Sequence, residues 1–344
     1  YNQGIWGLWF LWIGTISIFV VPIVFAPIWR KLDLKTDNDY ILLRLPGKDG
    51  IVLYHFRALF LSILVIPLLI SFHAVAFSRI IEVYFNVTAL NSKFIVCFII
   101  LCVVLKNRFE LKLKTDALNA GIYLVVFIIV TLYLCQSHDF SLSIAQQLAK
   151  IGPSHASLVP PDGNKIEWGN FWIVLLIQWW STTMMDGSGP EMIRFTALKN
   201  NKEIFKTAII TASLQLLMTL ILLAISLLLV VKIKNNSGEI QFVVLLFESI
   251  PNVLKGICMV GFLALFMSGV ESLLSWGGGL LHFEKINYNK NLREEVNTKK
   301  AYFFMFIISM IGCLCTLLFE NLHQIILFIF SISAGVAPIF ILRW

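Results

Sequence analysis

The sequence predicts an all-α, multi-pass helical membrane protein with a single transmembrane domain over residues 1–344. Its residues are 58% hydrophobic and only 14% charged, whereas a soluble domain carries about 25% charged residues. The apolar residues come in uniform blocks, and a spanning helix needs roughly 20 of them. Only helices and closed barrels satisfy their backbone groups in lipid, and these blocks lack the alternation of barrel strands.

Nine apolar blocks are predicted to cross the bilayer. They cover residues 5–29, 55–77, 93–105, 118–136, 168–186, 207–231, 254–281, 301–318 and 323–342. The third is short, so we expect it to be tilted, extended or broken. A shorter apolar stretch, 240–250, ends at Pro251 and is predicted to lie at the interface or to fold back over a cavity. Because the chain begins with Tyr1 and ends directly after an apolar run, we expect both ends to be incomplete.

Basic residues in the connections alternate between the two sides of the membrane. Most of the 27 Lys and Arg residues fall on one side when the connections are assigned in turn. The positive-inside rule places that side in the cytoplasm, which predicts a multi-pass protein of the cell membrane, inner or plasma. The net charge of +7 follows from the same rule. We therefore expect acidic lipid headgroups of the bilayer, and no nucleic acid, as partners of these residues.

The densest polar cluster inside an apolar block lies at the end of span 168–186. It contains Gln178, Asp186 and Ser188, and glycines and a proline follow directly. Such residues break a helix, and transporters use broken helices to expose backbone groups to a solute. We predict that these three side chains bind the substrate. The alternative is that the helix ends here and Asp186 faces the cytoplasm.

A second polar cluster lies in span 254–281. Ser268, Ser272 and Ser275 are spaced i, i+4 and i+7 and so share one helix face. Their hydroxyls offer oxygen ligands to a hard cation such as sodium. Alternatively, they are small packing residues, each bonded back to its own helix. Glu271 lies about midway along the span, where a charge must face protein or water. It is a candidate coupling residue, or a single acid tolerated in a cavity.

Asp116 stands at the predicted cytoplasmic start of span 118–136. An acid before an apolar run is a good N-cap, and capping alone would explain it. The sequence has no Walker-type phosphate loop, no nucleophile elbow and no paired metal-binding histidines. His73, His282 and His323 are isolated from one another. We therefore expect that the protein is not an enzyme.

The motifs resemble, in order, those of the sodium:solute symporter family, which includes sodium-coupled proline, sugar and sialic acid transporters. The resemblance covers most of the chain. The matching pieces are Pro27-Ile28-Trp29-Arg30 with Thr36 and Arg44, Thr115-Asp116, Gly187-Ser188-Gly189 through Arg194, Pro251 with Leu254 and Gly256, Ala264 with Phe266-Met267-Ser268 and Trp276-Gly277, and Ala337-Pro338 with Leu342-Arg343-Trp344.

This resemblance implies the LeuT-like five-plus-five inverted repeat with alternating access. The nine spans would be core helices two to ten, and the first core helix would be missing. It also implies Na+ as the coupling ion, no organic cofactor, and a small polar solute as the cargo. The implied sodium-binding residues are Ala264, Ser268, Asp116 and Ser272. The implied substrate-binding residues are Gln178, Asp186, Ser188 and Ser275.

The chain departs from the family pattern at several polar positions. Gly269 stands where the family has a second hydroxyl, and Leu265 where it has a small residue. Ser275 and Ile193 replace an Asn and a Gln. These departures leave three alternatives to sodium-coupled import. They are a non-transporting sensor on the same scaffold, a diverged inactive copy, and a proton-coupled transporter in which Glu271 replaces a lost sodium ligand.

Overall fold

The regular structure of this protein is helical throughout its described residues. The computed structural model describes residues 20–32, 36–106, 112–137, 165–173, 198–230, 240–281 and 298–333, together with Trp6, Trp9, Leu34, Ser157, Val159, Pro160, 175–176 and Gly189. Its elements are η2 (Val21–Phe25), α2 (Ala26–Leu32), α3 (Asp39–Arg44), α4 (Lys48–Leu59), η3 (Phe60–Val65), α5 (Ile66–Phe85), α6 (Ala89–Lys106), α7 (Lys112–Ser137), α9 (Lys165–Ile173), α12 (Asn201–Val230), α13 (Ile240–Glu248), α14 (Asn252–Leu281), α15 (Thr298–Leu318) and α16 (Leu322–Ser333). The predicted all-α fold class is confirmed.

Five helices in the described part of the chain are long and apolar enough to cross a membrane. They cover Lys48–Phe85, Thr115–Gln136, Asn201–Leu229, Asn252–Leu281 and Lys300–Leu318. Each contains most or all of a predicted span. The predicted span 93–105 corresponds to a shorter apolar helix, Ala89–Val104, and α13 matches the short helix predicted over 240–250. Spans 5–29, 168–186 and 323–342 lie partly outside the described residues.

The helix predicted over 55–77 is much longer than its apolar core. It runs without interruption from Lys48 to Phe85 through α4, η3 and α5. The π-type turn η3 ends at Val65, two residues before Pro67. Proline has no N–H, so one i→i−4 hydrogen bond of the α-helix is missing in the turn before it. The turn can then adopt the wider i→i−5 hydrogen bonds of a π-helix. Asn86 ends the helix in the left-handed conformation, with φ of 51°, which asparagine tolerates well.

The chain forms two compact units, each built from segments distant in sequence. The first unit comprises Tyr1–Asp33, Leu124–Cys258 and Phe330–Trp344, and the second comprises Leu34–Tyr123 and Met259–Ile329. α7, α14 and α16 each contribute residues to both.

In the first unit, α2 packs against the start of α12. Ala26 lies against Ile204 and Ala208, and all three are at most 2% exposed. The first turn of α12 is capped reciprocally. The Asn200 side chain accepts from the Glu203 N–H at 2.9 Å, while Glu203 Oε2 accepts from the Lys199 N–H at 3.0 Å. Such a cap satisfies donors that lack partners within the helix.

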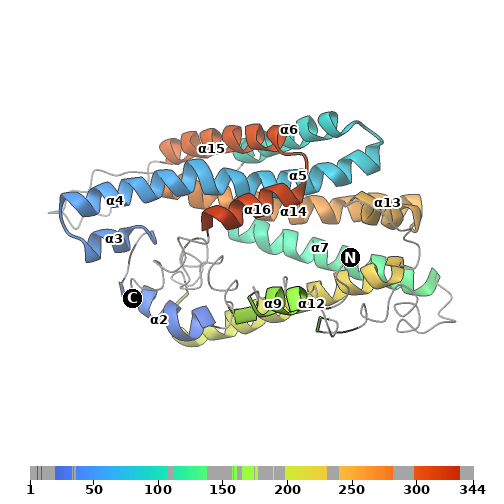
Figure 1. The fold of residues 1–344 in the computed structure, drawn as a ribbon, viewed down its shortest axis with the longest axis horizontal. Helices are drawn as coiled ribbons and strands as arrows, with labels where there is room; N and C mark the ends of the chain where they lie inside the picture. The colour runs from blue at the N-terminus through green and yellow to red at the C-terminus, as the bar shows by residue number, and fades with distance from the viewer. Residues whose placement is uncertain are drawn as a thin grey trace. The chain divides into compact units, whose positions relative to one another are not determined.

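In the second unit, α5, α6 and α15 run side by side and pack against one another (Figure 1). α14 packs on α5 in antiparallel register. Phe77 of α5 stacks on Phe266 of α14 with ring centroids 4.6 Å apart, and the Ser62 hydroxyl of η3 donates to the Gly277 carbonyl at 3.2 Å. Small residues such as Ser62 and Gly277 allow helices in membranes to approach one another closely.

Gly278 brings α14 and α15 together. A Cβ atom at this position would lie 2.8 Å from Met305 Cγ and 3.2 Å from the Ala301 carbonyl. We expect Gly278→Ala to lower the free energy of unfolding by about 1–3 kcal/mol, because the added methyl overpacks the contact. Gly121 of α7 is the matched control, since a Cβ there meets nothing within 4 Å. Gly121→Ala should be neutral or stabilise by up to about 1 kcal/mol through helix propensity. Thermal denaturation in detergent measures both, and shifts of the same sign would contradict the packing argument.

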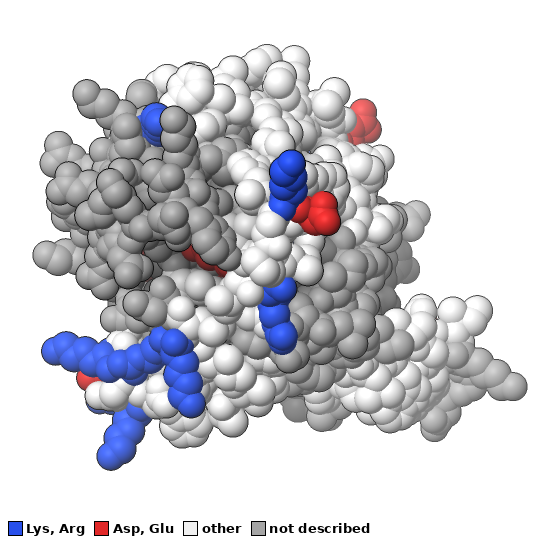
Figure 2. Space-filling model, turned by 90° about the vertical axis from the view of Figure 1, so that its left-hand side faces the viewer, with Lys and Arg blue, Asp and Glu red and all other residues white. Residues whose placement is uncertain are grey.

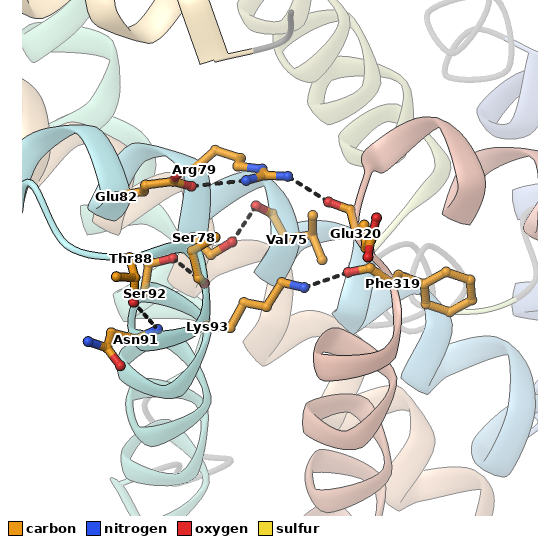
Figure 3. A network of polar contacts seen from close by, with 11 residues as sticks. Val75, Ser78, Arg79, Glu82, Thr88, Asn91, Ser92, Lys93, Phe319 and Glu320 are labelled. Carbon is orange, nitrogen blue, oxygen red and sulfur yellow. Dashed lines mark hydrogen bonds and ion pairs between the residues drawn. The ribbon is translucent and has the colours of Figure 1, made fainter.

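Two cations from neighbouring helices hold the turn after α15 (Figure 3). Lys93 Nζ of α6 donates to the Phe319 carbonyl at 2.7 Å. Arg79 of α5 donates to the Glu320 carbonyl at 2.7 Å and pairs with Glu82 at 3.0 Å. Carbonyls at a helix C-terminus lack intrahelical donors and carry partial negative charge, so cations there stabilise the end. The turn that leads into α16 is thereby anchored.

Basic side chains stand out from the surface that Figure 2 draws. Figure 2 shows the Lys and Arg groups standing out from this face, with fewer Asp and Glu groups beside them. The connection between α3 and α4 carries Arg44 and Lys48, and the positive-inside rule predicts that a connection of this kind lies in the cytoplasm.

Candidate cation and solute site

Five of the predicted site residues lie on one face of α14. Placing about 3.6 residues per turn puts them all within an arc of about 100°. They are Ala264, Ser268, Glu271, Ser272 and Ser275, and we call this arc the polar face of α14. Gly277 lies on the opposite side of the helix from Ser268 and packs against Ile66 and Ile308. The polar face of α14 thus lies opposite the side on which Gly277 packs against these neighbours.

Asp116 of α7 faces Ser268 across the second unit. The Ser268 hydroxyl points at Asp116 Oδ1 with 3.5 Å between the two oxygens, which is long for an ordinary O–H···O bond. The N-cap interpretation of Asp116 is wrong, because α7 begins at Lys112 and Asp116 lies inside it. Its carboxylate is thus turned towards another helix and not to the end of its own. The two residues are 152 positions apart in the chain.

Ser268 differs from many other hydroxyls of the described helices. Those donate to a carbonyl three or four residues back on their own helix, as expected for Ser and Thr in apolar surroundings. They are Ser78, Thr131, Thr219, Ser226, Ser275, Ser309 and Thr316. The packing alternative therefore describes Ser275, whose hydroxyl donates to the Glu271 carbonyl at 2.8 Å. Ser268 instead has its hydroxyl directed to a carboxylate.

The remaining predicted residues of the polar face are shielded from solvent to different degrees. Ala264 and Glu271 are buried, at 5% and 8% exposure, and Ser272 is partly buried. A carboxyl as buried as that of Glu271 is costly inside an apolar helix and marks a functional candidate.

The predicted substrate residues Gln178, Asp186 and Ser188 lie outside the described residues. The neighbouring Gly189 is described, and it is buried with φ of 78°. A left-handed residue of this kind ends a right-handed helix. The residues on both sides of Gly189 lie outside the described ones, so the interruption of the helix at the end of span 168–186 stays a prediction.

A buried ion pair near the polar face was not predicted from the sequence. Arg57 of α4 binds Asp37 at 2.6 Å, with side-chain exposures of 10% and 2%. The same guanidinium donates to Asn38 Oδ1 at 2.9 Å, and the Trp276 indole of α14 makes a long hydrogen bond, 3.4 Å, to Asp37. The pair thus joins the segment before α3, α4 and the end of α14. Burial raises the pKa of the adjacent Asp39 carboxyl.

The long apolar helices make this chain a multi-pass membrane protein, with a carboxylate and a hydroxyl facing each other between two of them. A solved structure with the same fold is that of a Na+-coupled sialic acid symporter in a substrate-bound outward-open state, described as having a novel Na+ site. The alignment has a TM-score of 0.73 at 14% sequence identity. It covers 100% of this chain and 73% of the chain of the solved structure. The family model of the sodium:solute symporters matches residues 1–343.

This chain therefore belongs to the sodium:solute symporter family, as the sequence motifs predicted. Its symporter fold, of the LeuT-like kind, is confirmed. A comparison with curated proteins finds no match.

Proposed function

We propose that this protein is a sodium-coupled symporter of the cell membrane that imports a small polar solute by alternating access. Asp116 and Ser268 bind the coupling ion, with Ala264 and Ser272 beside them on the polar face of α14. Gln178, Asp186, Ser188 and Ser275 bind the solute.

The separation of Ser268 Oγ and Asp116 Oδ1 carries this proposal. Two oxygen ligands that lie about 2.4 Å from a hard cation, at a right angle to each other, are about 3.4 Å apart. The observed distance is 3.5 Å. A carboxylate and a hydroxyl supply one negative charge and two oxygens, a donor set that suits a monovalent hard cation. The site needs further oxygens, and backbone carbonyls are suitable sources.

Coupling follows from differential binding. An ion shifts a conformational equilibrium only as far as it binds one state more tightly than the other. Sodium held between α7 and α14 favours the state in which Asp116 and Ser268 face each other. If that state also binds the solute better, each ligand raises the affinity for the other by the same factor, typically 5–150-fold. The sodium gradient then drives solute entry.

The experiment is reconstitution of the full-length protein in proteoliposomes. We expect an inward sodium gradient to drive accumulation of one member of a panel of labelled amino acids, sugars and sialic acids, and an equal potassium gradient to drive none. Binding of 22Na+ to the purified protein tests the ion site without knowledge of the solute. Absence of 22Na+ binding would refute sodium coupling. Accumulation driven by a proton gradient without sodium would instead favour proton coupling, for which buried Glu271 is the candidate.

A further inference from the structure

His73 is an ionisable residue in the middle of the long apolar helix that runs from Lys48 to Phe85. Its ring lies against Gly269 of α14. A Cβ atom built on Gly269 would be 3.2 Å from His73 Nε2 and 3.4 Å from Cδ2. Among the described residues, the imidazole has no hydrogen-bond or ion-pair partner, and its ring contact is with the neighbouring Phe72. A polar side chain of this kind is costly in an apolar span and marks a functional position.

The packing around His73 fixes where its ring points. Phe77 stacks on Phe266 on one side of it, and Ile66 contacts the Gly277 position on the other. His73 lies between these two contacts in the antiparallel register of α5 and α14. Its ring is therefore held against α14 at the height of Gly269, and the missing side chain at Gly269 leaves the space that the imidazole occupies.

Gly269 borders the polar face of α14. It follows Ser268 directly and lies about 100° from it around the helix. The acids of the site do not lie on this flank. Asp116 faces Ser268, and Glu271 is about 200° from Gly269 around α14. His73 thus brings a polar nitrogen to α14 at Gly269, the position that directly follows Ser268.

We propose that His73 is a further residue of the cation site, whose Nε2 accepts a hydrogen bond from a water molecule on the bound sodium ion at the flank left open by Gly269. This inference rests on the proposed function. A neutral imidazole has one donor and one acceptor nitrogen. Hard cations take oxygen ligands and commonly retain water, so a nitrogen acts through that water and not as a direct ligand. The hydrogen bond from the polarised water positions it on the ion.

The test is 22Na+ binding to the purified full-length protein, without solute. We expect His73→Leu to raise the Kd for sodium about tenfold, as for the loss of one charge-assisted hydrogen bond. His73→Gln keeps an acceptor and should stay within about threefold of wild type. The double variant His73→Ala/Gly269→Ser places a hydroxyl in the vacated space and should recover most of the affinity. His55→Leu is the matched control. His55 lies on the same long helix, but its Nδ1 contacts the carbonyl of Ile51 one turn back on that helix, at 2.7 Å.

The outcomes separate this inference from the proposed function. If wild type binds 22Na+ and Asp116→Asn does not, an unchanged Kd in His73→Leu overturns the role of His73 and leaves the sodium site intact. A lower denaturation temperature with an unchanged Kd makes His73 a packing residue and also overturns the inference. If wild type binds no 22Na+, both proposals fail. Should His73→Leu not fold, the glutamine variant and the double variant decide the matter by their Kd values.

Discussion

Asp116→Asn is expected to weaken sodium binding at least about 100-fold, a loss of about 2.7 kcal/mol. Asparagine keeps an oxygen ligand of similar size but removes the negative charge opposite Ser268. Two unit charges about 4 Å apart interact by about 4 kcal/mol at an effective dielectric constant of 20, so the expected loss is within what the charge supplies. Equilibrium binding of 22Na+ measures it, and sodium-driven uptake should be lost in parallel.

Asp49→Asn is the matched control for this prediction. Asp49 is an acid in the first turn of α4, in the same unit as Asp116, and it is exposed. Its neutralisation removes the same charge from the protein without touching the polar face of α14. Sodium affinity should stay at the wild-type value. Equal effects of the two substitutions would show that Asp116 acts through net charge and not as a ligand.

Arg57→Leu is expected to lower the free energy of unfolding by about 3–5 kcal/mol. The substitution leaves the Asp37 carboxylate, 2% exposed, without its cation, and an uncompensated buried charge carries a penalty of that size. The double variant Arg57→Leu/Asp37→Asn removes both charges and should lose less than the single variant. Thermal denaturation of the detergent-solubilised protein, followed by size-exclusion chromatography, gives the order of stabilities.

Glu82→Gln provides the comparison for a more exposed ion pair. Arg79 and Glu82 are 22% and 23% exposed and lie i, i+3 on one helix. Pairs of this kind contribute at most about 1 kcal/mol, so the variant should denature close to wild type. If Arg57→Leu were as mild as Glu82→Gln, the pair at Asp37 would be open to water and would not tie α14 to α4.

The spanning helices were predictable because a helix that crosses lipid needs a run of about 20 mostly apolar residues, which is visible in the sequence. Their ends were not, because helices end at caps and not where apolar residues stop. α12 begins at Asn201, six residues before its predicted start, since Asn200 and Glu203 form the cap. In the same way α7 begins in a charged stretch at Lys112, and for this reason N-capping could stand as an alternative role for Asp116 in the sequence.

The polar contacts of the site depend on tertiary structure that no local pattern encodes. The face shared by Ser268, Ser272 and Ser275 follows from spacing alone. That Ser268 meets Asp116 could be suspected only from the family resemblance, because the two are 152 positions apart. Arg57 and Lys93 stand at the starts of the predicted spans 55–77 and 93–105, where sequence alone gives them no partner. Both are buried, at 8% exposure each, where one pairs with Asp37 and the other caps α15.

The anchored turn at Phe319 and Glu320 constrains how α16 can move. A rod that is fixed at one end can change direction only by swinging about that end. The twelve residues from Leu322 to Ser333 make a rod about 18 Å long at about 1.5 Å per residue. A swing of about 10° would displace its far tip by about 3 Å while the base stays in place. Lys93 and Arg79 therefore make the start of α16 a pivot. A small rotation about this pivot produces a displacement that increases towards the far end of the helix.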